Sequence, residues 1–111
     1  MIIHLDSDIF DIVLSGTKNI ECRVNDEKRR KLKIGDTLTF LRRPDDIDKI
    51  DTIIEDLVYF DTFEQLVDNY NIEQIYLKDY TKEDFINLIK RFYSDEEISK
   101  YGVVAIKFKK M

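Results

Sequence analysis

The sequence predicts an α+β fold in which a small mixed β-sheet of about five to six strands curls into a barrel, with helices packed on it. Two observations support this prediction. Short apolar runs separated by turn-forming residues fill the first 60 positions and return at the end of the chain, whereas residues 61 to 100 carry helical spacing and helix-capping signals. The 111 residues suffice for one domain with its own core and are too few for two ordinary domains, so we expect a single domain over residues 1 to 111.

The first part of the chain alternates between strand and helix. Its apolar pattern predicts an opening strand over residues 2 to 5. A helix follows, capped by Asp6 or Ser7, with apolar side chains at helical spacing, namely Ile9, Phe10, Val13 and Leu14. Gly16 should end this helix, because glycine readily adopts the left-handed conformation that turns the chain, and a strand over residues 19 to 24 follows.

Three further strands are expected, over residues 38 to 42, 50 to 60 and 103 to 108. The turn between the first two contains Pro44, which has no N–H to donate to a strand ladder. The strand over residues 50 to 60 has apolar side chains on both faces, so it should lie inside the sheet rather than at its edge.

Residues 61 to 100 are expected to be helical. Capping signals mark three helix starts: Asp61 with Glu64, Thr81, and Ser94 with Glu97. The helix after Thr81 should carry four apolar side chains, Phe85, Leu88, Ile89 and Phe92. Residues 69 to 79 should form a short helix or an irregular link.

Composition excludes several classes of protein. A hydrophobic fraction of 43% beside 37% charged residues is typical of a folded globular protein and not of a disordered chain. No apolar run approaches the roughly 20 residues of a membrane-spanning helix. The first residues lack the features of a signal peptide, so we expect a cytoplasmic protein without a membrane partner. One Cys and one His argue against an internal disulfide and structural zinc, and we expect no metal and no cofactor.

The net charge of −5 hides an asymmetry along the chain. Residues 17 to 43 carry nine basic and four acidic side chains, a local charge of +5, while the rest of the chain carries −10. A basic segment within an acidic protein can steer an anionic ligand to one face. The alternative is that the basic run from Lys28 to Lys33 is only a solvated loop.

A polar strand face precedes this basic run. Side chains alternate along a strand, so residues 19 to 24 fall into an apolar set and a polar set: Ile20, Cys22 and Val24 against Asn19, Glu21 and Arg23. Lys18 can reach over the polar set, which would gather an ammonium, a carboxylate and a guanidinium around a polar ligand. The alternative is a solvated face, since exposed ion pairs are typically worth only about 0 to 1 kcal/mol.

These residues resemble a known family. Gly16, Lys18, Glu21 and Arg23 fit G-x-K-x-x-E-x-R, the signature of the ASCH domain, a relative of the PUA RNA-binding modules. The similarity continues at residues 25 to 36 (N-D-E-K-R-R-K-L-K-I-G-D) and 101 to 108 (Y-G-V-V-A-I-K-F), so the chain resembles the small single-domain type of bacteria and archaea over nearly its whole length. The resemblance implies a PUA-like β-barrel. It also implies an RNA-binding or nucleotide-binding function, since ASCH domains are generally thought to bind RNA.

In the binding interpretation, one set of residues holds the ligand: Lys18, Glu21, Arg23, Lys28, Arg29, Arg30 and Tyr101. The basic side chains contact phosphates, which supply affinity without sequence choice, while Glu21 and Arg23 face a base or another polar group. Tyr93 or Tyr101 would stack on a base, although a place in the core is the more ordinary role for either ring.

The resemblance leaves an enzymatic interpretation open. Some small ASCH-like proteins are amidohydrolases acting on acetylated cytidine, and their threonine nucleophile occupies the position of Glu21. Glutamate cannot serve in that way, but Glu21 and Lys18 remain candidates for general base catalysis, or, with His4, for a ribonuclease. His4 alone is more often a polar filler than a catalyst. A third interpretation, without specific support, uses the acidic residues 79 to 97 as a protein-binding surface.

Overall fold

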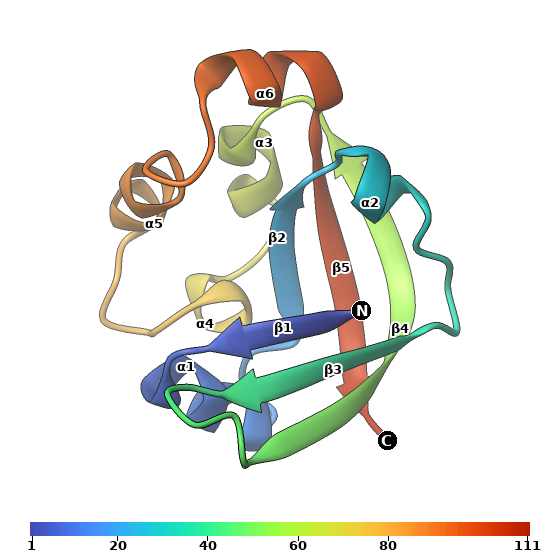
Figure 1. Cartoon of the computed structure of the whole chain (residues 1–111). Coiled ribbons are helices and arrows are strands. Elements are labelled where there is room, and N and C mark those ends of the chain that lie inside the picture. Colours follow the sequence, from blue (N-terminus) through green and yellow to red (C-terminus); the bar gives the residue numbers. More distant parts are fainter.

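The computed structural model describes all residues from 1 to 111 and shows a curled β-sheet with helices packed against it (Figure 1). The elements are β1 (Ile2–Leu5), α1 (Ser7–Leu14), β2 (Ile20–Val24), α2 (Glu27–Arg30), β3 (Thr37–Arg42), β4 (Lys49–Phe60), α3 (Phe63–Asp68), α4 (Ile72–Ile75), α5 (Lys82–Ile89), α6 (Asp95–Tyr101) and β5 (Val103–Lys110). None of the helices combines the length and the apolar character that crossing a membrane requires.

The five strands form one mixed sheet in the order β1-β3-β4-β5-β2. β1 runs parallel to β3, and the other neighbouring pairs are antiparallel. The sheet curls so far that β1 crosses in front of β2 in Figure 1, although these two edge strands are not hydrogen-bonded to each other. The predicted mixed sheet with packed helices is confirmed, in the form of a half-barrel that stays open between β1 and β2.

β4 lies between β3 and β5, as its two apolar faces predict. It is 12 residues long and pairs with β3 through its first part and with β5 through its second. A register shift between Ile54 and Asp56 interrupts the pairing with β5. Such a bulge bends a strand and increases its twist, which helps the sheet to curl.

Buried side chains form two clusters, one between α1 and the sheet and one between β2 and helices α3 to α6. The predicted alternation on β2 is confirmed, because Ile20, Cys22 and Val24 all belong to the second cluster. β5 serves both clusters, since its side chains alternate between them: Val104 and Ile106 lie in the first, Val103 and Ala105 in the second.

The helical region follows most of the capping predictions. Thr81 and Ser94 cap α5 and α6 with the reciprocal hydrogen bonds of a capping box, and α4 lies in the stretch expected to be a short helix or link. The prediction for Asp61 is wrong. Thr62 is the N-cap of α3, and its side chain accepts a hydrogen bond from the Gln65 N–H, while the Asp61 N–H donates to the Gln65 side chain. The cap therefore lies one residue later than expected.

α5 ends earlier than its apolar spacing predicts. Its last residue is Ile89, and the N–H groups of Arg91 and Phe92 donate to carbonyls three residues earlier in the chain. This tighter pattern is common at helix ends. The expectation that Phe92 shares the apolar face of α5 is therefore wrong, because its side chain lies beyond the helix and is 74% exposed.

The turn after α1 delivers Lys18 to the start of β2. Asp6 is the N-cap of α1, and Gly16 follows its C-terminal end with a φ of 85°, a conformation that favours glycine. The Lys18 N–H then donates to the Ile12 carbonyl at 2.9 Å, and the Asn19 N–H donates to the Gln74 carbonyl at 3.0 Å. These two hydrogen bonds attach the start of β2 to α1 and to α4.

Candidate functional site

The half-barrel presents two unpaired strand edges to one space. The Arg43 N–H donates to the Leu5 carbonyl, so the odd-numbered residues of β1 bond to β3. Backbone groups alternate in direction along a strand, so those of Ile2 and His4 point to the open side. β2 is the other edge and pairs only with β5.

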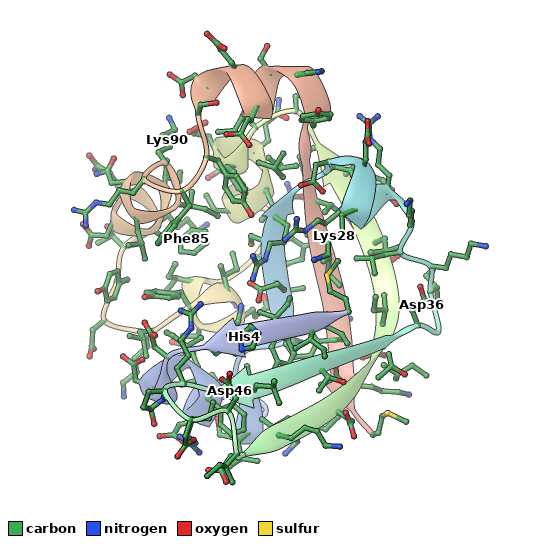
Figure 2. All side chains as sticks on the ribbon, viewed as in Figure 1. His4, Lys28, Asp36, Asp46, Phe85 and Lys90 are labelled. Atoms are coloured by element: carbon green, nitrogen blue, oxygen red, sulfur yellow. The ribbon has the colours of Figure 1, made fainter.

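A cleft of about 560 Å³ lies between these edges. Figure 2 shows its borders: Phe85 on α5 and Lys28 on α2 lie on opposite sides of β2, with His4 of β1 below them. The wall along α5 is apolar, and the floor is formed by three charged side chains, Lys18, Glu21 and Arg23. The polar face of β2 therefore lines a cleft and is not a flat solvated surface.

Lys18 is a buried hydrogen-bond donor at this floor. Its side chain is only 3% exposed, and its Nζ donates to the carbonyls of Ile20 at 2.5 Å and Ile75 at 2.7 Å. Glu21 is its ion-pair partner, with 3.5 Å between Nζ and Oε1. An ammonium has three donors, and two of those of Lys18 form hydrogen bonds to backbone carbonyls. Lys18 therefore holds β2 to the end of α4 and positions Glu21.

Glu21 is a buried carboxylate with one unmatched oxygen. The residue is 8% exposed, and its Oε2 lies 3.6 Å from Arg23 Nη2, too far for a hydrogen bond, so Oε2 has no hydrogen-bond partner. Burial alone would raise the pKa of Glu21, but the charges of Lys18 and Arg23, with help from the Cys22 N–H, outweigh burial and hold that pKa below its ordinary value. Glu21 is thus an ionised hydrogen-bond acceptor and a weak base.

The acid dependence of stability follows from this lowered pKa. The folded pKa of Glu21 lies below 4.5, so the ionised carboxylate stabilises the fold fully above that pH and loses its effect as the pH falls through the folded pKa. We expect the melting-temperature difference between wild type and Glu21→Gln to be largest near neutrality and to shrink below pH 4.5. Thermal melts between pH 7 and pH 3 check this, with Glu83→Gln, at an exposed position, as the control. A difference that grows on acidification contradicts it.

Arg23 supplies the unmatched donor beside this acceptor. Its side chain is 24% exposed, and its Nε–H is buried without a hydrogen-bond partner. Burial alone would lower the pKa of Arg23, but the Glu21 carboxylate and the Tyr93 hydroxyl outweigh burial and raise it. The Tyr93 ring stacks on Phe63, with 6.1 Å between ring centroids. Arg23 is therefore a cation at the floor with one buried N–H that lacks a hydrogen-bond partner.

Basic side chains surround the mouth of the cleft. Lys28 and Arg29 come from α2, and Arg43 follows β3. Arg29 forms a 3.0 Å ion pair with Asp26, whose side chain also caps α2 by accepting the Arg29 N–H. The basic run therefore includes a capped helical turn, and two of the side chains of this turn, Lys28 and Arg29, line the cleft.

Two of the sequence-predicted ligand-binding residues lie outside the cleft. Arg30 turns away, because its Nε donates to the Asn25 carbonyl and its guanidinium lies 5.5 Å from the centre of the Tyr101 ring. Lys100 contacts the same ring at 5.0 Å. Tyr101 lines a separate hollow of about 860 Å³ near α3 and α6. Lys18, Glu21, Arg23, Lys28 and Arg29 are brought together, whereas Arg30 and Tyr101 are not.

The cleft also contains residues that the sequence does not assign to a site. The sequence predicts a turn at Arg43 and a core-facing helix with Phe85 and Phe92. His4, a candidate only in the ribonuclease interpretation, lines the mouth, with 3.1 Å between its Nδ1 and Asp46 Oδ2. No signal in the sequence relates Arg43 or Phe92 to β2, since the contact depends on how β1 and α5 pack.

The remaining groups give little scope for other chemistry. Burial raises the pKa of the Cys22 thiol to about 12, so it is a core side chain and not a nucleophile. No group of three or more His, Cys, Asp and Glu side chains is arranged to hold a metal ion. The basic and acidic side chains that line the cleft include Lys18, Glu21 and Arg23 at the floor and Lys28, Arg29 and Arg43 at the mouth.

Comparisons with known proteins agree with this architecture. The chain is similar to the crystal structure of hypothetical protein PH0355, with a TM-score of 0.81 and 25% identity, covering 99% of this chain and 97% of that one. It is also similar to the solution NMR structure of protein PF0455 from Pyrococcus furiosus, with a TM-score of 0.74 and 26% identity, covering 100% of this chain and 98% of that one. No curated protein matches. The model of the ASCH domain matches residues 3–111, and the chain therefore belongs to the ASCH domain family.

Proposed function

We propose that the cleft binds RNA or a nucleotide, with one unpaired base at Glu21 and Arg23 and phosphates at the basic mouth. The observation that carries this proposal is the unmatched pair at the floor, the acceptor Glu21 Oε2 beside the donor Arg23 Nε–H. A buried polar group left without a partner costs roughly 1–3 kcal/mol. A ligand recovers this cost if it reaches both atoms, which are buried from solvent in the empty protein.

A nucleobase edge has the required chemistry. Adenine, for example, presents a donor and an acceptor side by side, so that an N–H can reach Glu21 while a ring nitrogen accepts from Arg23. The cleft volume of about 560 Å³ falls within the range of small-ligand pockets. A single unpaired base is a ligand of this kind, and proteins read single-stranded RNA through such splayed bases.

The basic mouth and the family support the same ligand. The mouth of the cleft carries the basic residues Lys28, Arg29 and Arg43, although the protein as a whole is acidic. Positive charge at this place favours a phosphorylated ligand. ASCH domains are generally thought to bind RNA. Both observations point to a nucleic acid or nucleotide rather than to a neutral ligand.

The hydrolase interpretation receives less support. Lys18 is buried and bound to two carbonyls, and the lowered pKa of Glu21 makes that carboxylate a poor proton acceptor at neutral pH. The family's amidohydrolase nucleophile is replaced by Glu21. We therefore propose binding without turnover.

A single experiment separates binding from turnover. Purified protein is titrated with a random-sequence RNA decamer and with the four ribonucleoside monophosphates, then incubated with the same decamer and with acetylated cytidine while products are followed by mass spectrometry. Saturable binding without product supports the proposal. Product that disappears in Glu21→Gln assigns the cleft to a hydrolase instead, and absence of binding to any probe refutes the proposal.

The basic mouth should contribute through phosphates. We expect Lys28→Ala with Arg29→Ala to weaken binding of all RNA sequences alike and to flatten the dependence of log affinity on log salt by up to about one unit for each lost contact. The matched control is Arg30→Ala with Lys31→Ala, which removes the same charge from the same run but away from the cleft. Titrations at several salt concentrations decide the matter. Equal losses in both double variants contradict a role for the mouth.

A further inference from the structure

An aromatic ring stands exposed at the rim of the cleft. Phe92 lines the cleft and is 74% exposed, while its neighbour Tyr93 is held inward by stacking on Phe63 and by contact with Arg23. The tight turn after α5 fixes the backbone at this point. Phe92 is thus an apolar surface held at the mouth of a charged site.

Positive charge lies on two sides of the same mouth. Arg43 lies at the carboxyl end of β1, where its N–H bonds to the Leu5 carbonyl and its exposed guanidinium lies 3.6 Å from the Asp6 carboxylate. Lys28 and Arg29 lie on α2, and Figure 1 shows α2 on the side of the amino end of β1. An RNA backbone that crosses the cleft along β1 would therefore have Arg43 near one end of the cleft and Lys28 and Arg29 near the other.

We infer that the ligand is a continuous single strand of RNA, with one base in the cleft, the adjacent base stacked on Phe92, and phosphates on both sides of the inserted base. This inference rests on the proposed function and deepens it, because it separates an RNA strand from a free nucleotide. A mononucleotide has a phosphate on one side only and no second base, so it leaves Phe92 and one basic group unused.

In this arrangement the aromatic ring of Phe92 and the polar pair of Glu21 and Arg23 contribute to binding in different ways. Stacking on an aromatic ring accepts any base, since every base has a flat face. Hydrogen bonds to Glu21 and Arg23 distinguish base edges. The strand is therefore read at one nucleotide, and the neighbouring nucleotide adds affinity without selectivity.

The test compares strand and mononucleotide binding in the full chain. Wild type, Phe92→Ala and Phe92→Trp are titrated with a random-sequence RNA decamer and with the four ribonucleoside monophosphates. We expect Phe92→Ala to weaken decamer binding roughly 5- to 150-fold, the range for one lost base stack, and to leave monophosphate binding unchanged. Phe92→Trp should restore decamer binding. Tyr59→Ala, an exposed aromatic residue that borders the other hollow, is the matched control.

Charge variants give a second, independent readout. Arg43→Ala and the Lys28→Ala, Arg29→Ala double variant should each weaken binding of the decamer. Only one of these two variants should weaken binding of the monophosphates. If the decamer and the monophosphates bind wild type equally tightly, the inference is overturned, while the proposed nucleotide site is still supported. Equal losses of both ligands in Phe92→Ala also overturn it. Failure of both ligands to bind wild type refutes the proposed function itself.

Discussion

Lys18→Met is expected to lower the free energy of unfolding by about 3–5 kcal/mol, the usual result of removing one partner from a buried ion pair. Methionine keeps the length and apolar stem of the side chain but leaves the Ile20 and Ile75 carbonyls without their donor and Glu21 with only Arg23. For a domain of this size the melting temperature should fall by roughly 10–25 °C. Thermal and denaturant unfolding measure the effect.

The matched control for this prediction is Lys31→Met, at an exposed lysine after α2, which should stay within about 0.5 kcal/mol of wild type. Lys18→Met combined with Glu21→Leu should recover part of the stability, because it removes the carboxylate that has lost its partner. A melting temperature close to wild type in Lys18→Met, with lost RNA binding, contradicts the positioning role and makes Lys18 a direct ligand contact.

Arg23→Lys is expected to weaken RNA binding roughly 5- to 150-fold, the range for one hydrogen-bonded base contact. Lysine keeps the positive charge beside Glu21 but cannot reproduce the Nε–H of a planar guanidinium, which is the free donor at the floor. The loss should be at least as large as that of the Lys28→Ala, Arg29→Ala double variant. It should also narrow the preference among RNA sequences, which the double variant leaves unchanged.

Arg91→Lys, an exposed position near the end of α5, is the matched control and should bind like wild type. Melting temperatures measured in parallel show whether the Arg23 variant is folded. If Arg23→Lys binds like wild type while the Lys28→Ala, Arg29→Ala variant loses binding, recognition takes place at the basic mouth and the floor only supports the fold.

Local rules predicted β2 and its two faces. Alternation placed Glu21 and Arg23 opposite the apolar set, and the glycine turn placed Lys18 beside them. The partners of Lys18 were beyond reach, because the Ile75 carbonyl lies 57 residues away on α4 and meets Nζ only through tertiary packing. The sequence therefore indicated which residues gather but not that the lysine would bind two backbone carbonyls.

Element boundaries account for the remaining errors at the site. The spacing of Phe85, Ile89 and Phe92 continues the helical period, yet the backbone tightens after Ile89 and Phe92 leaves the apolar face. Periodicity cannot register this change, because it records side-chain character and not backbone bonding. Tyr101 and Arg30 are adjacent to the correct segments, but Tyr101 lines the other hollow and the Arg30 guanidinium lies over the Tyr101 ring.

The position of β5 has a consequence for the order in which the molecule is assembled. β2 pairs with no strand other than β5, whose residues follow it by about 80 positions, and β5 contributes side chains to both buried clusters. During synthesis neither cluster is complete, and β2 has no strand partner, until residues 103 to 108 have left the ribosome. Contacts this distant in sequence slow folding, because a long loop must close before they form. A nascent chain therefore carries the signature residues of the cleft well before it has a cleft, and RNA affinity should appear only with the finished protein.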